Sequence, residues 1–334
     1  MKKTLVAIAA LAVVGAASAQ SSVTLYGRID ASIGSDKTTL NGTTIADKGT
    51  LIRAGAHTGN RWGLKGSEDL GGGLKANFQL EQGFNVDDGS AADATKQFSR
   101  QSWVGLSGGF GSLQVGRQYD IIDVAYGKHD AFGSSGFSPN AALAAGTGGD
   151  IIVRQNNSVL YSTPSMGGLS GAVMWAPGED KAVGVKASNM YGLSAGYANG
   201  PIGLGAAWQS NKTNSFKAVT NYVLGGSYDF GAAKLYAQYA GTNNKPVNTK
   251  DNGYSLGVVI PLGAPSVTIG YGTDKTKVAG TKSQDVTSFA VMAQYPLSKR
   301  TYVYAAYRAL ETDPTGPSNT TKNKKFGLGL VHNF

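Results

Sequence analysis

The sequence predicts an all-β protein that crosses a membrane as a closed, antiparallel barrel of 16 strands. Three observations lead to this prediction. From Ser22 onward a segment of about ten residues with alternating polarity recurs, and the segments are separated by Gly, Pro, Asn or Asp. The connections between segments alternate between short and long, and after the first residues no apolar run is long enough for a transmembrane helix.

Residues 1–19 have the pattern of a cleaved signal peptide. Two lysines precede an apolar run over 5–14, and Ala-Ser-Ala at 17–19 is a small-residue cleavage site. The run is too short to cross a bilayer comfortably, which favours cleavage over a membrane anchor. We therefore expect an exported chain that begins at Gln20 and forms one barrel domain, residues 20–334.

The charge and the missing cysteines exclude several classes of site. Without the leader, 28 Lys and Arg against 21 Asp and Glu leave a net charge of +7. Such a balance suits nucleic acid, acidic lipid or an anionic solute. Export argues against nucleic acid, and the basic residues do not gather with interleaved aromatics as a nucleic-acid groove requires. Without cysteine, disulfides and thiolate metal sites are excluded.

The alternating connections define the strands in order. Seven short connections are predicted at 69–72, 108–111, 163–168, 199–201, 229–232, 261–265 and 296–299. Eight long polar ones are predicted near 34–58, 85–96, 120–152, 177–189, 210–218, 242–251, 275–285 and 310–323. Seven plus eight connections join 16 strands, and an even number places both ends beside the short periplasmic turns. A soluble β-sandwich, the main alternative, gives no reason for this rhythm.

Alternation also separates a lipid face from a lumen face. Over 23–33 the odd-numbered residues are apolar or small, whereas Arg28 and Asp30 fall on the other face. Over 326–334 the even-numbered residues are apolar except for His332, and this face ends on Phe334, at the height of an aromatic girdle. Charges therefore point inward, and a barrel of this width keeps an aqueous lumen.

The 48 glycines and 16 tyrosines need an explanation as well. We interpret the glycines as strand and turn residues that let the barrel curve, and the tyrosines mainly as girdle.

The third long connection, residues 120–152, exceeds the ordinary length of a structureless loop. It contains four aspartates, Asp120, Asp123, Asp130 and Asp150. A mobile surface loop is one interpretation, but the segment is rich in Ala, Ile, Val and Phe for a solvated tip. We predict that it folds into the lumen, where these apolar groups are buried and the channel is narrowed.

Five segments in a fixed order resemble the general, nonspecific porins of Gram-negative bacteria, of the β-proteobacterial type. They are SSVTLYGRID, NRWGLKGSEDLGGGLKANFQLE, FSRQSWVGLSGGFGSLQVGRQYD, VRQNNSVLYSTP and the terminal Phe334. Each motif is weak alone, whereas five in order are specific and cover essentially the whole chain. The resemblance implies homotrimers of 16-stranded barrels in the outer membrane, with the third loop facing basic residues on the opposite wall.

The resemblance implies a basic wall at the pore constriction, formed by Arg28, Arg61, Arg100 and Arg154. The alternation of odd- and even-numbered residues, here called parity, also places Arg28 in the lumen, because Arg28 falls on the polar face of its strand. Outward Trp62 and Leu64 put Arg61 in the lumen, and outward Val159 and Tyr161 put Arg154 there.

Parity is ambiguous for Arg100. If Trp103 faces lipid, Arg100 faces the lumen, but Val104 and Leu106 would then also point inward. A bulge that resets the phase would remove this conflict.

On the loop side, the resemblance places an acidic residue beside Phe-Gly, which here is Asp130 of Asp-Ala-Phe-Gly. The proline that is common at this place in the family is absent, which affects the expected rigidity of the turn. Asp123 is a second candidate, and a solvated loop charge is the alternative for each aspartate. Arg117 shares the parity of the outward residues on its strand, so we assign it, with Asp120, to the base of the loop.

The predicted function is a water-filled channel for passive diffusion of small hydrophilic solutes and inorganic ions. About four arginines against one or two aspartates predict a mild anion preference. The alternative is a substrate-specific anion channel, which should show a ladder of lumen arginines or stacked aromatics along several strands. An adhesin or receptor barrel, whose loops matter more than its lumen, is a third hypothesis.

We expect no enzyme, cofactor or metal site. His57, His129 and His332 fall in a loop, in the third loop and on the lipid face, with no spacing that supports a Ser-His-Asp set. The glycine run at 71–73 lies in a turn between strands, not before a helix. The expected partners are two more copies of the chain, outer-membrane lipid and lipopolysaccharide, and an outer-membrane assembly machinery that recognises Phe334.

Overall fold

The computed structural model describes residues 22–48, 51–146, 153–184, 187–212, 218–315 and 319–334. The predicted signal peptide, residues 1–19, lies outside these residues, and so does Asp150 of the third long connection. Within the described ranges, no helix is both long and apolar enough to cross a membrane.

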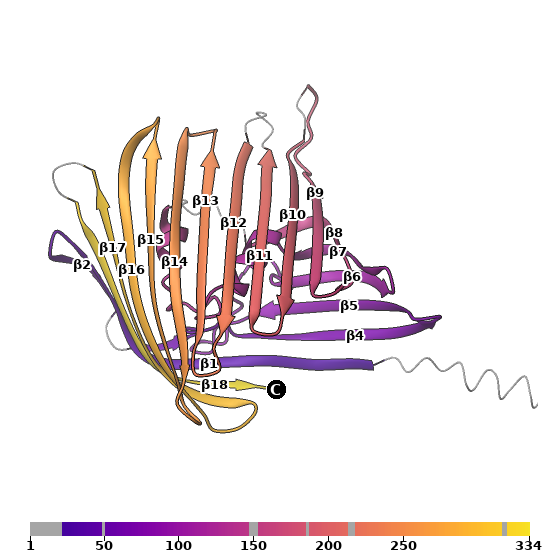
Figure 1. Ribbon diagram of the computed structural model, residues 1–334, viewed down its shortest axis with the longest axis horizontal. Helices are drawn as coiled ribbons and strands as arrows, with labels where there is room; N and C mark the ends of the chain where they lie inside the picture. The colour runs from indigo at the N-terminus through magenta and orange to yellow at the C-terminus, as the bar shows by residue number, and fades with distance from the viewer. Residues whose placement is uncertain (1–21, 49–50, 147–152, 185–186, 213–217, 316–318) are drawn as a thin grey trace, which may run out of the picture.

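A single antiparallel sheet of 18 strands forms the body of the molecule (Figure 1). The strands are β1 (Ser22–Leu40), β2 (Thr43–Asp47), β3 (Leu51–Ala54), β4 (Arg61–Gly71), β5 (Leu74–Gly83), β6 (Gln101–Gly108), β7 (Gly111–Tyr119), β8 (Arg154–Ser162), β9 (Leu169–Pro177), β10 (Asn189–Asn199), β11 (Ile202–Lys212), β12 (Ala218–Asp229), β13 (Lys234–Asn244), β14 (Thr249–Pro261), β15 (Ser266–Val278), β16 (Thr281–Pro296), β17 (Thr301–Pro314) and β18 (Thr321–Asn333). The helices α2 (Ile121–Lys128) and α3 (Ala141–Gly146) both lie between β7 and β8.

Sixteen of these strands make a closed barrel. The short strands β2 and β3 both pair with β1 and belong to the connection between β1 and β4, so 18 minus 2 strands remain. Strands β4 to β18 pair in chain order, β1 pairs with β4, and the ring closes where β1 pairs with β18. The predicted 16-stranded antiparallel barrel is confirmed. Within the described residues, closure pairs each of the 16 barrel strands with a neighbour on both sides, which is what a strand protein in lipid requires.

The short turns lie where the alternation of connections predicts them, whereas several long connections are shorter than predicted. Strand β8 ends at Ser162 and β9 begins at Leu169, in agreement with the turn predicted at 163–168. By contrast, β15 and β16 leave only residues 279–280 of the connection predicted at 275–285. Backbone pairing continues above the apolar band because it does not depend on apolar side chains. The polarity pattern therefore shows where the lipid ends and not where the strands end.

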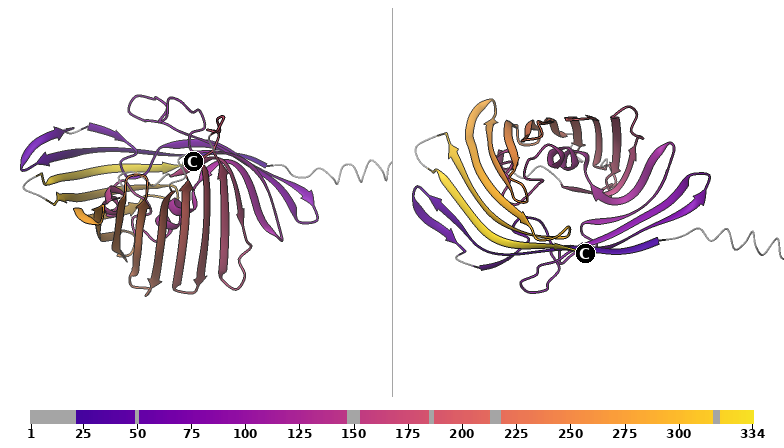
Figure 2. Two further views of the ribbon diagram at one scale, coloured as in Figure 1. Left: turned by 90° about the horizontal axis from the view of Figure 1, so that it is seen from above. Right: turned by 60° about the horizontal axis from the view of Figure 1, so that its bottom comes forward.

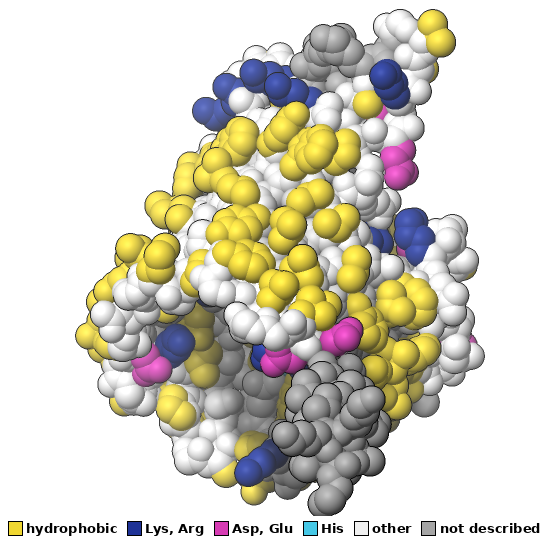
Figure 3. Space-filling model, turned by 90° about the vertical axis from the view of Figure 1, so that its right-hand side faces the viewer, with side chains coloured by type: hydrophobic (Ala, Val, Ile, Leu, Met, Phe, Trp, Pro, Cys, Tyr) yellow, Lys and Arg dark blue, Asp and Glu magenta, His cyan; other side chains and the backbone are white. Residues whose placement is uncertain are grey.

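The two faces of the barrel differ as the alternation predicts. Large apolar side chains on the outer face are exposed, for example Leu25 (58%), Leu204 (52%) and Leu224 (61%). Their neighbours on the inner face are buried, for example Asp30 and Val223. Figure 3 shows hydrophobic side chains spread over the outer surface, with Lys and Arg gathered at its upper edge. The outer face therefore suits lipid, and the inner face carries the polar groups.

The segment between β7 and β8 packs against the inner face of the barrel. The buried side chains of Ile121 and Ile122 on α2 join one apolar cluster with wall residues from β9 to β13, among them Met190, Ala207 and Val223. The helix α3 packs against β14, β15 and β16. In the right-hand view of Figure 2 both helices lie within the curve of the sheet. Ile121, Ile122 and Leu143 thus bury their side chains against the lumen side, next to the polar groups described below.

Candidate functional site

The inward segment begins with a buried helix cap. Asp120 follows the last residue of β7, and its Oδ1 accepts a hydrogen bond of 2.6 Å from the backbone N–H of Asp123. Its Oδ2 accepts one of 3.2 Å from the side chain of Gln209 on β11. Burial raises the pKa of Asp120 to about 7. Asp120 therefore links the start of α2 to β11.

Two of the predicted arginines meet at one tyrosine. Arg100 Nη2 and Arg154 Nη2 donate hydrogen bonds of 2.8 Å and 2.7 Å to the hydroxyl of Tyr119, the last residue of β7. Arg100 Nε also donates to Glu81 Oε1 at 2.7 Å, within a largely buried ion pair. Two guanidinium groups are thus held side by side on the wall formed by β5, β7 and β8.

The other two predicted arginines lie opposite each other on neighbouring strands. Arg28 on β1 and Arg61 on β4 are direct partners in the ladder. Arg28 Nε donates to Asn333 Oδ1 at 2.6 Å, and its Nη1 donates to Thr58 Oγ1 at 3.1 Å. Arg61 lies within electrostatic range of Arg28 and of Arg100. The structure therefore brings all four arginines into one basic group on the lumen wall.

The buried carboxylate of Asp30 holds the segment that contacts Arg28. Its Oδ2 accepts hydrogen bonds from the backbone N–H groups of His57 and Thr58, at 2.8 Å and 2.7 Å. Its Oδ1 accepts one from the hydroxyl of Tyr304, at 2.9 Å. These bonds fix residues 57–58, and Thr58 in turn contacts Arg28.

Asp123 is the carboxylate that faces the basic group. It lies on α2, and its electrostatic partners are Arg154 and Arg100. Burial raises the pKa of Asp123 to about 6, and the two arginines oppose that shift. At neutral pH a negative charge on the inward loop thus faces positive charges on the wall.

Asp130, the other predicted carboxylate, does not reach the basic group. Its side chain is buried within the loop, where Oδ1 accepts from the backbone N–H of Phe132 and Oδ2 from that of Ser134, both at 2.9 Å. Burial raises the pKa of this carboxyl. The structure therefore corrects the placement of Asp130: it stabilises the turn that follows it, in a sequence that lacks the expected proline.

Arg100 precedes β6, so strand parity does not apply to it. The outward residues of this strand are Val104 and Leu106, whereas Trp103 alternates with them and lies opposite Gln79, whose side chain donates to Tyr26 on the inner face. The premise of an outward Trp103 is wrong, and β6 has no register shift against either neighbour where a bulge was expected.

Arg117 braces the segments that carry two of the wall arginines. Its Nε donates to the carbonyl of Ser99 at 2.7 Å, and its Nη1 donates to Asn156 Oδ1. Ser99 precedes Arg100, and Asn156 follows Arg154 by two residues on β8. A register shift between β7 and β8 lies at this point and changes the direction of the side chain.

Two basic residues that the sequence analysis missed hold the tip of the inward loop. Lys325 Nζ donates to the carbonyls of Ala56 and Gly136, at 3.1 Å and 3.2 Å, and lies 4.5 Å from the ring centroid of Phe137. Arg308 Nη1 donates to the carbonyl of Gly136 at 3.2 Å. The parity rule that placed Arg61 would have identified Arg308, because Val303 on the same strand faces outward.

His57 completes this attachment. Its ring Nδ1 lies 2.7 Å from Ser135 Oγ, and its carbonyl accepts a hydrogen bond of 2.9 Å from the backbone N–H of Gly136. Burial, followed by the nearby charges of Arg28 and Lys325, lowers the pKa of His57 to about 4. The neutral ring therefore acts as part of the packing and carries no charge at neutral pH.

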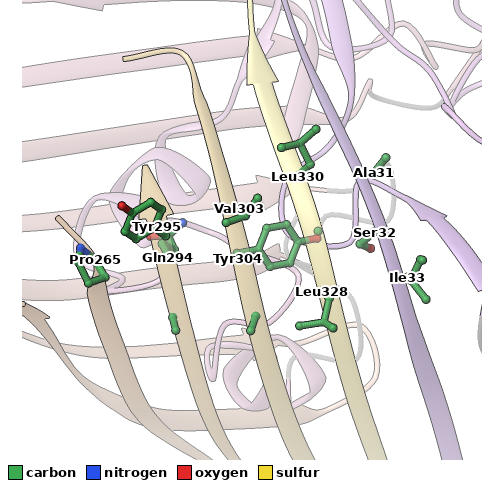
Figure 4. Close-up of a pocket in the computed structure, with 13 residues that line it drawn as sticks. Ala31, Ser32, Ile33, Pro265, Gln294, Tyr295, Val303, Tyr304, Leu328 and Leu330 are labelled. Carbon is green, nitrogen blue, oxygen red and sulfur yellow. The ribbon is translucent and has the colours of Figure 1, made fainter. Parts of the chain in front are cut away.

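The outer face carries an apolar groove that is separate from this site. A groove of about 710 Å³ crosses β1, β16, β17 and β18, and Figure 4 shows Ile33, Val303, Leu328 and Leu330 among its lining residues. These side chains are exposed on the lipid face. The groove offers no charge to a hydrophilic solute, so the candidate site is the lumen constriction. Among the described residues, no group of three His, Cys, Asp or Glu side chains is placed to hold a metal ion.

Comparisons with known proteins agree with this architecture. The sequence pattern of the family described as Gram-negative porin matches residues 4–315. The chain is 34% identical to an outer membrane porin protein of Bordetella pertussis over the full length of both chains. It is 37% identical to outer membrane porin protein 32 of Delftia acidovorans over 91% of this chain and 88% of the relative. Among solved structures, an anion-selective porin from Comamonas acidovorans superposes with a TM-score of 0.79 at 26% identity, over 94% of this chain and 100% of the other.

Proposed function

Because the chain belongs to the family of Gram-negative porins, which are outer-membrane channels and not enzymes, we propose that it admits small hydrophilic solutes and ions by passive diffusion, with a mild preference for anions. The observation that carries the proposal is the grouping of Arg28, Arg61, Arg100 and Arg154 on one wall opposite Asp123 on α2. The name of the similar Comamonas acidovorans protein, an anion-selective porin, supports the preference.

The net charge of the constriction gives the sign of the selectivity. Four arginines stand against two carboxylates, Glu81 and Asp123, so four minus two leaves +2. Salt screens charges over about 8 Å at physiological ionic strength, so a narrow gap between wall and loop is not fully screened. Anions are therefore favoured inside the gap, and arginine keeps its charge at any physiological pH.

The same geometry favours hydrophilic solutes over apolar ones. Opposite charges on the wall and on the loop set up a field across the gap, and this field orients water. A polar solute replaces these interactions as it passes, whereas an apolar solute displaces oriented water and offers no hydrogen bond in return. Small polar molecules thus pass at a lower free-energy cost.

The remaining parts of the proposal concern assembly. We propose that three copies associate, and a solved structure with the same fold is described as a trimer form. We further propose that residues 1–19 are removed on export, that Phe334 is read by the assembly machinery, and that lipopolysaccharide contacts the basic upper edge seen in Figure 3.

The test is single-channel conductance, with the reversal potential in a salt gradient, on purified protein in a planar bilayer. Large ohmic steps in groups of three with a weak anion preference are expected. Small currents blocked by one particular anion would instead indicate a substrate-specific anion channel. No current at all would contradict the proposal and direct attention to the external loops.

Neutralising Arg61 and Arg154 together should abolish the anion preference. The change to glutamine at both positions removes two positive charges, and two minus two leaves no net charge at the constriction. The reversal potential should therefore move toward that of a non-selective or cation-preferring channel. An unchanged reversal potential in the folded double variant would show that these arginines do not line the constriction.

A further inference from the structure

The hydroxyl of Tyr119 is shared by two guanidinium groups that come from different segments. Arg100 lies in the connection before β6, and Arg154 is the first residue of β8 and the ladder partner of Tyr119. Both donate to the same oxygen, at 2.8 Å and 2.7 Å. The Cζ of Arg154 also lies 4.3 Å from the centroid of the Tyr119 ring. One neutral side chain thus contacts both cations.

Arg154 depends on this contact more than Arg100 does. Arg100 has a second attachment through its Nε, at 2.7 Å from Glu81 Oε1. The Nε of Arg154 is buried without a partner, and within the described part of the chain Tyr119 is the only hydrogen-bond partner of its guanidinium. Loss of the Tyr119 oxygen would therefore free Arg154 first.

A freed Arg154 has an obvious new position. The carboxylate of Asp123 on α2 lies within electrostatic range of Arg154 and attracts it. Arg100 shares the Tyr119 oxygen with Arg154, and the repulsion between the two like charges opposes their close approach. A salt bridge from Arg154 to Asp123 would cross the gap, cancel one positive charge of the basic group and narrow the passage.

We propose that Tyr119 is a positioning residue for anion selectivity, which holds Arg100 and Arg154 on the wall and keeps Arg154 from pairing with Asp123. The inference rests on the proposed function, since it concerns the ion preference of the same constriction. Both lone pairs of the hydroxyl are occupied by arginine donors, and among the described residues its own proton has no acceptor. That proton remains available to water or to a passing anion.

The test is the substitution Tyr119→Phe, which keeps the ring and its packing and removes only the oxygen. One lost hydrogen bond reduces the occupancy of the held rotamer about fivefold. We expect the reversal potential in a salt gradient to move toward zero and the single-channel conductance to fall.

The matched control is Tyr302→Phe on β17. Tyr302 lies in the range of Arg28 and Arg61, but among the described residues its hydroxyl has no hydrogen-bond partner.

Two further backgrounds separate positioning from a direct role. In an Arg154→Gln background, Tyr119→Phe should have a much smaller effect, because the residue that it positions is gone. In an Asp123→Asn background the effect should also shrink, because the competing partner of Arg154 is neutral. The electrophoretic mobility of unboiled samples, which changes on heating, reports whether each variant is folded. Arg154→Lys, which keeps the positive charge without the planar guanidinium, serves as a second variant at this position.

Three outcomes would overturn the inference. A wild-type reversal potential in folded Tyr119→Phe is the first. The second is an equal shift with and without Arg154, and the third is an equal shift in Tyr302→Phe. These failures are distinct from a failure of the proposed function, because that function is tested on the wild-type channel, whose currents and anion preference are measured first.

Discussion

Asp123 supplies the negative charge that α2 presents to the basic group. It faces Arg154 and Arg100 from α2, and burial brings its pKa to about 6. Most carboxylates at a protein surface titrate well below this value. A group with this pKa changes its charge in a range where the arginines do not, so the balance of charges at the constriction depends on pH.

Lowering the pH through the pKa of Asp123 should increase the anion preference. Protonation removes the negative charge that Asp123 presents to Arg154 and Arg100, while the arginines keep theirs. A unit charge about 10 Å away, at an effective dielectric constant of about 20 and with screening, changes the anion-to-cation permeability ratio about two- to fivefold. The reversal potential in a salt gradient, measured from about pH 8 to about pH 5, reports this ratio.

The matched variants for this prediction are Asp123→Asn and Asp120→Asn. At every pH in this range, the Asp123→Asn channel should have the anion preference that the wild-type channel has at about pH 5. The second keeps a good helix cap and should retain most of the pH dependence, because Asp120 is buried against Gln209 and does not face the arginines. If the pH dependence survived in Asp123→Asn and disappeared in Asp120→Asn, the titrating group would be Asp120, and the prediction would be wrong.

At the scale of elements, the inward loop lies on a track of glycines. The inner face lacks a Cβ at several points where the loop passes: Gly192, Gly205, Gly225, Gly257, Gly270, Gly272 and Gly327. A Cβ added at Gly225 would lie 2.6 Å from the Cβ of His129, and one at Gly272 would lie 2.4 Å from the carbonyl oxygen of Pro139. These distances are too short for real contacts. The loop can approach the wall only because these side chains are missing.

Replacing Gly225 by valine should displace the end of α2 from the wall. The new side chain would overlap His129, and overpacking of this kind costs about 1 to 3 kcal/mol. The loop is pushed toward the middle of the lumen, so the single-channel conductance should fall.

The adjacent Gly226 provides the control for this prediction. It follows Gly225 on β12, points to the lipid face, and its nearest neighbour is the flexible end of Leu204. Gly226→Val should leave the conductance unchanged. Equal conductance in both variants would mean that the loop does not need this close approach.

At the scale of the whole molecule, the ring is closed by β1 and β18. Their pairing runs from Arg28 opposite Asn333 to Leu40 opposite Thr321. Beyond it, Phe334 exchanges two backbone hydrogen bonds with Gly27, at 3.0 Å and 3.1 Å, and its ring occupies the space above Gly27. The aromatic residue thus fastens the end of the seam on the lipid side.

Deleting Phe334 should lower the yield of closed barrel. The two backbone bonds together contribute about 2 kcal/mol, and the cover over Gly27 is lost with them. The measurement is the fraction of heat-modifiable, folded protein after refolding into detergent. Phe334→Tyr, which keeps the ring and the backbone bonds, should fold like the wild type. A deletion variant that refolds as well as Phe334→Tyr would contradict this role of the seam contact.

Periodicity predicted those features that depend on regular strands. The strand number and the inward direction of Arg28 and Arg61 follow from alternation, because a strand turns each side chain by a fixed amount. A register shift interrupts β8 between Arg154 and Val159, so alternation alone does not fix the direction of Arg154. Arg100 and Asp130 lie outside strands, where direction is set by local hydrogen bonds that polarity does not reveal. Tyrosines were assigned mainly to the girdle, yet Tyr26, Tyr119 and Tyr304 bind charged groups on the inner face. The glycine track was missed because composition cannot tell a close approach from a bend.

The attachment of the loop tip determines when the constriction can acquire its final width. Gly136 and Phe137 are held by Arg308 on β17, by Lys325 on β18 and by His57, which Asp30 of β1 fixes in place. These partners come from both ends of the barrel sequence, although the loop itself lies between β7 and β8. During biogenesis the loop is synthesised long before its last two anchoring strands. The constriction therefore takes its final width only when β17 and β18 are in place to hold the loop tip.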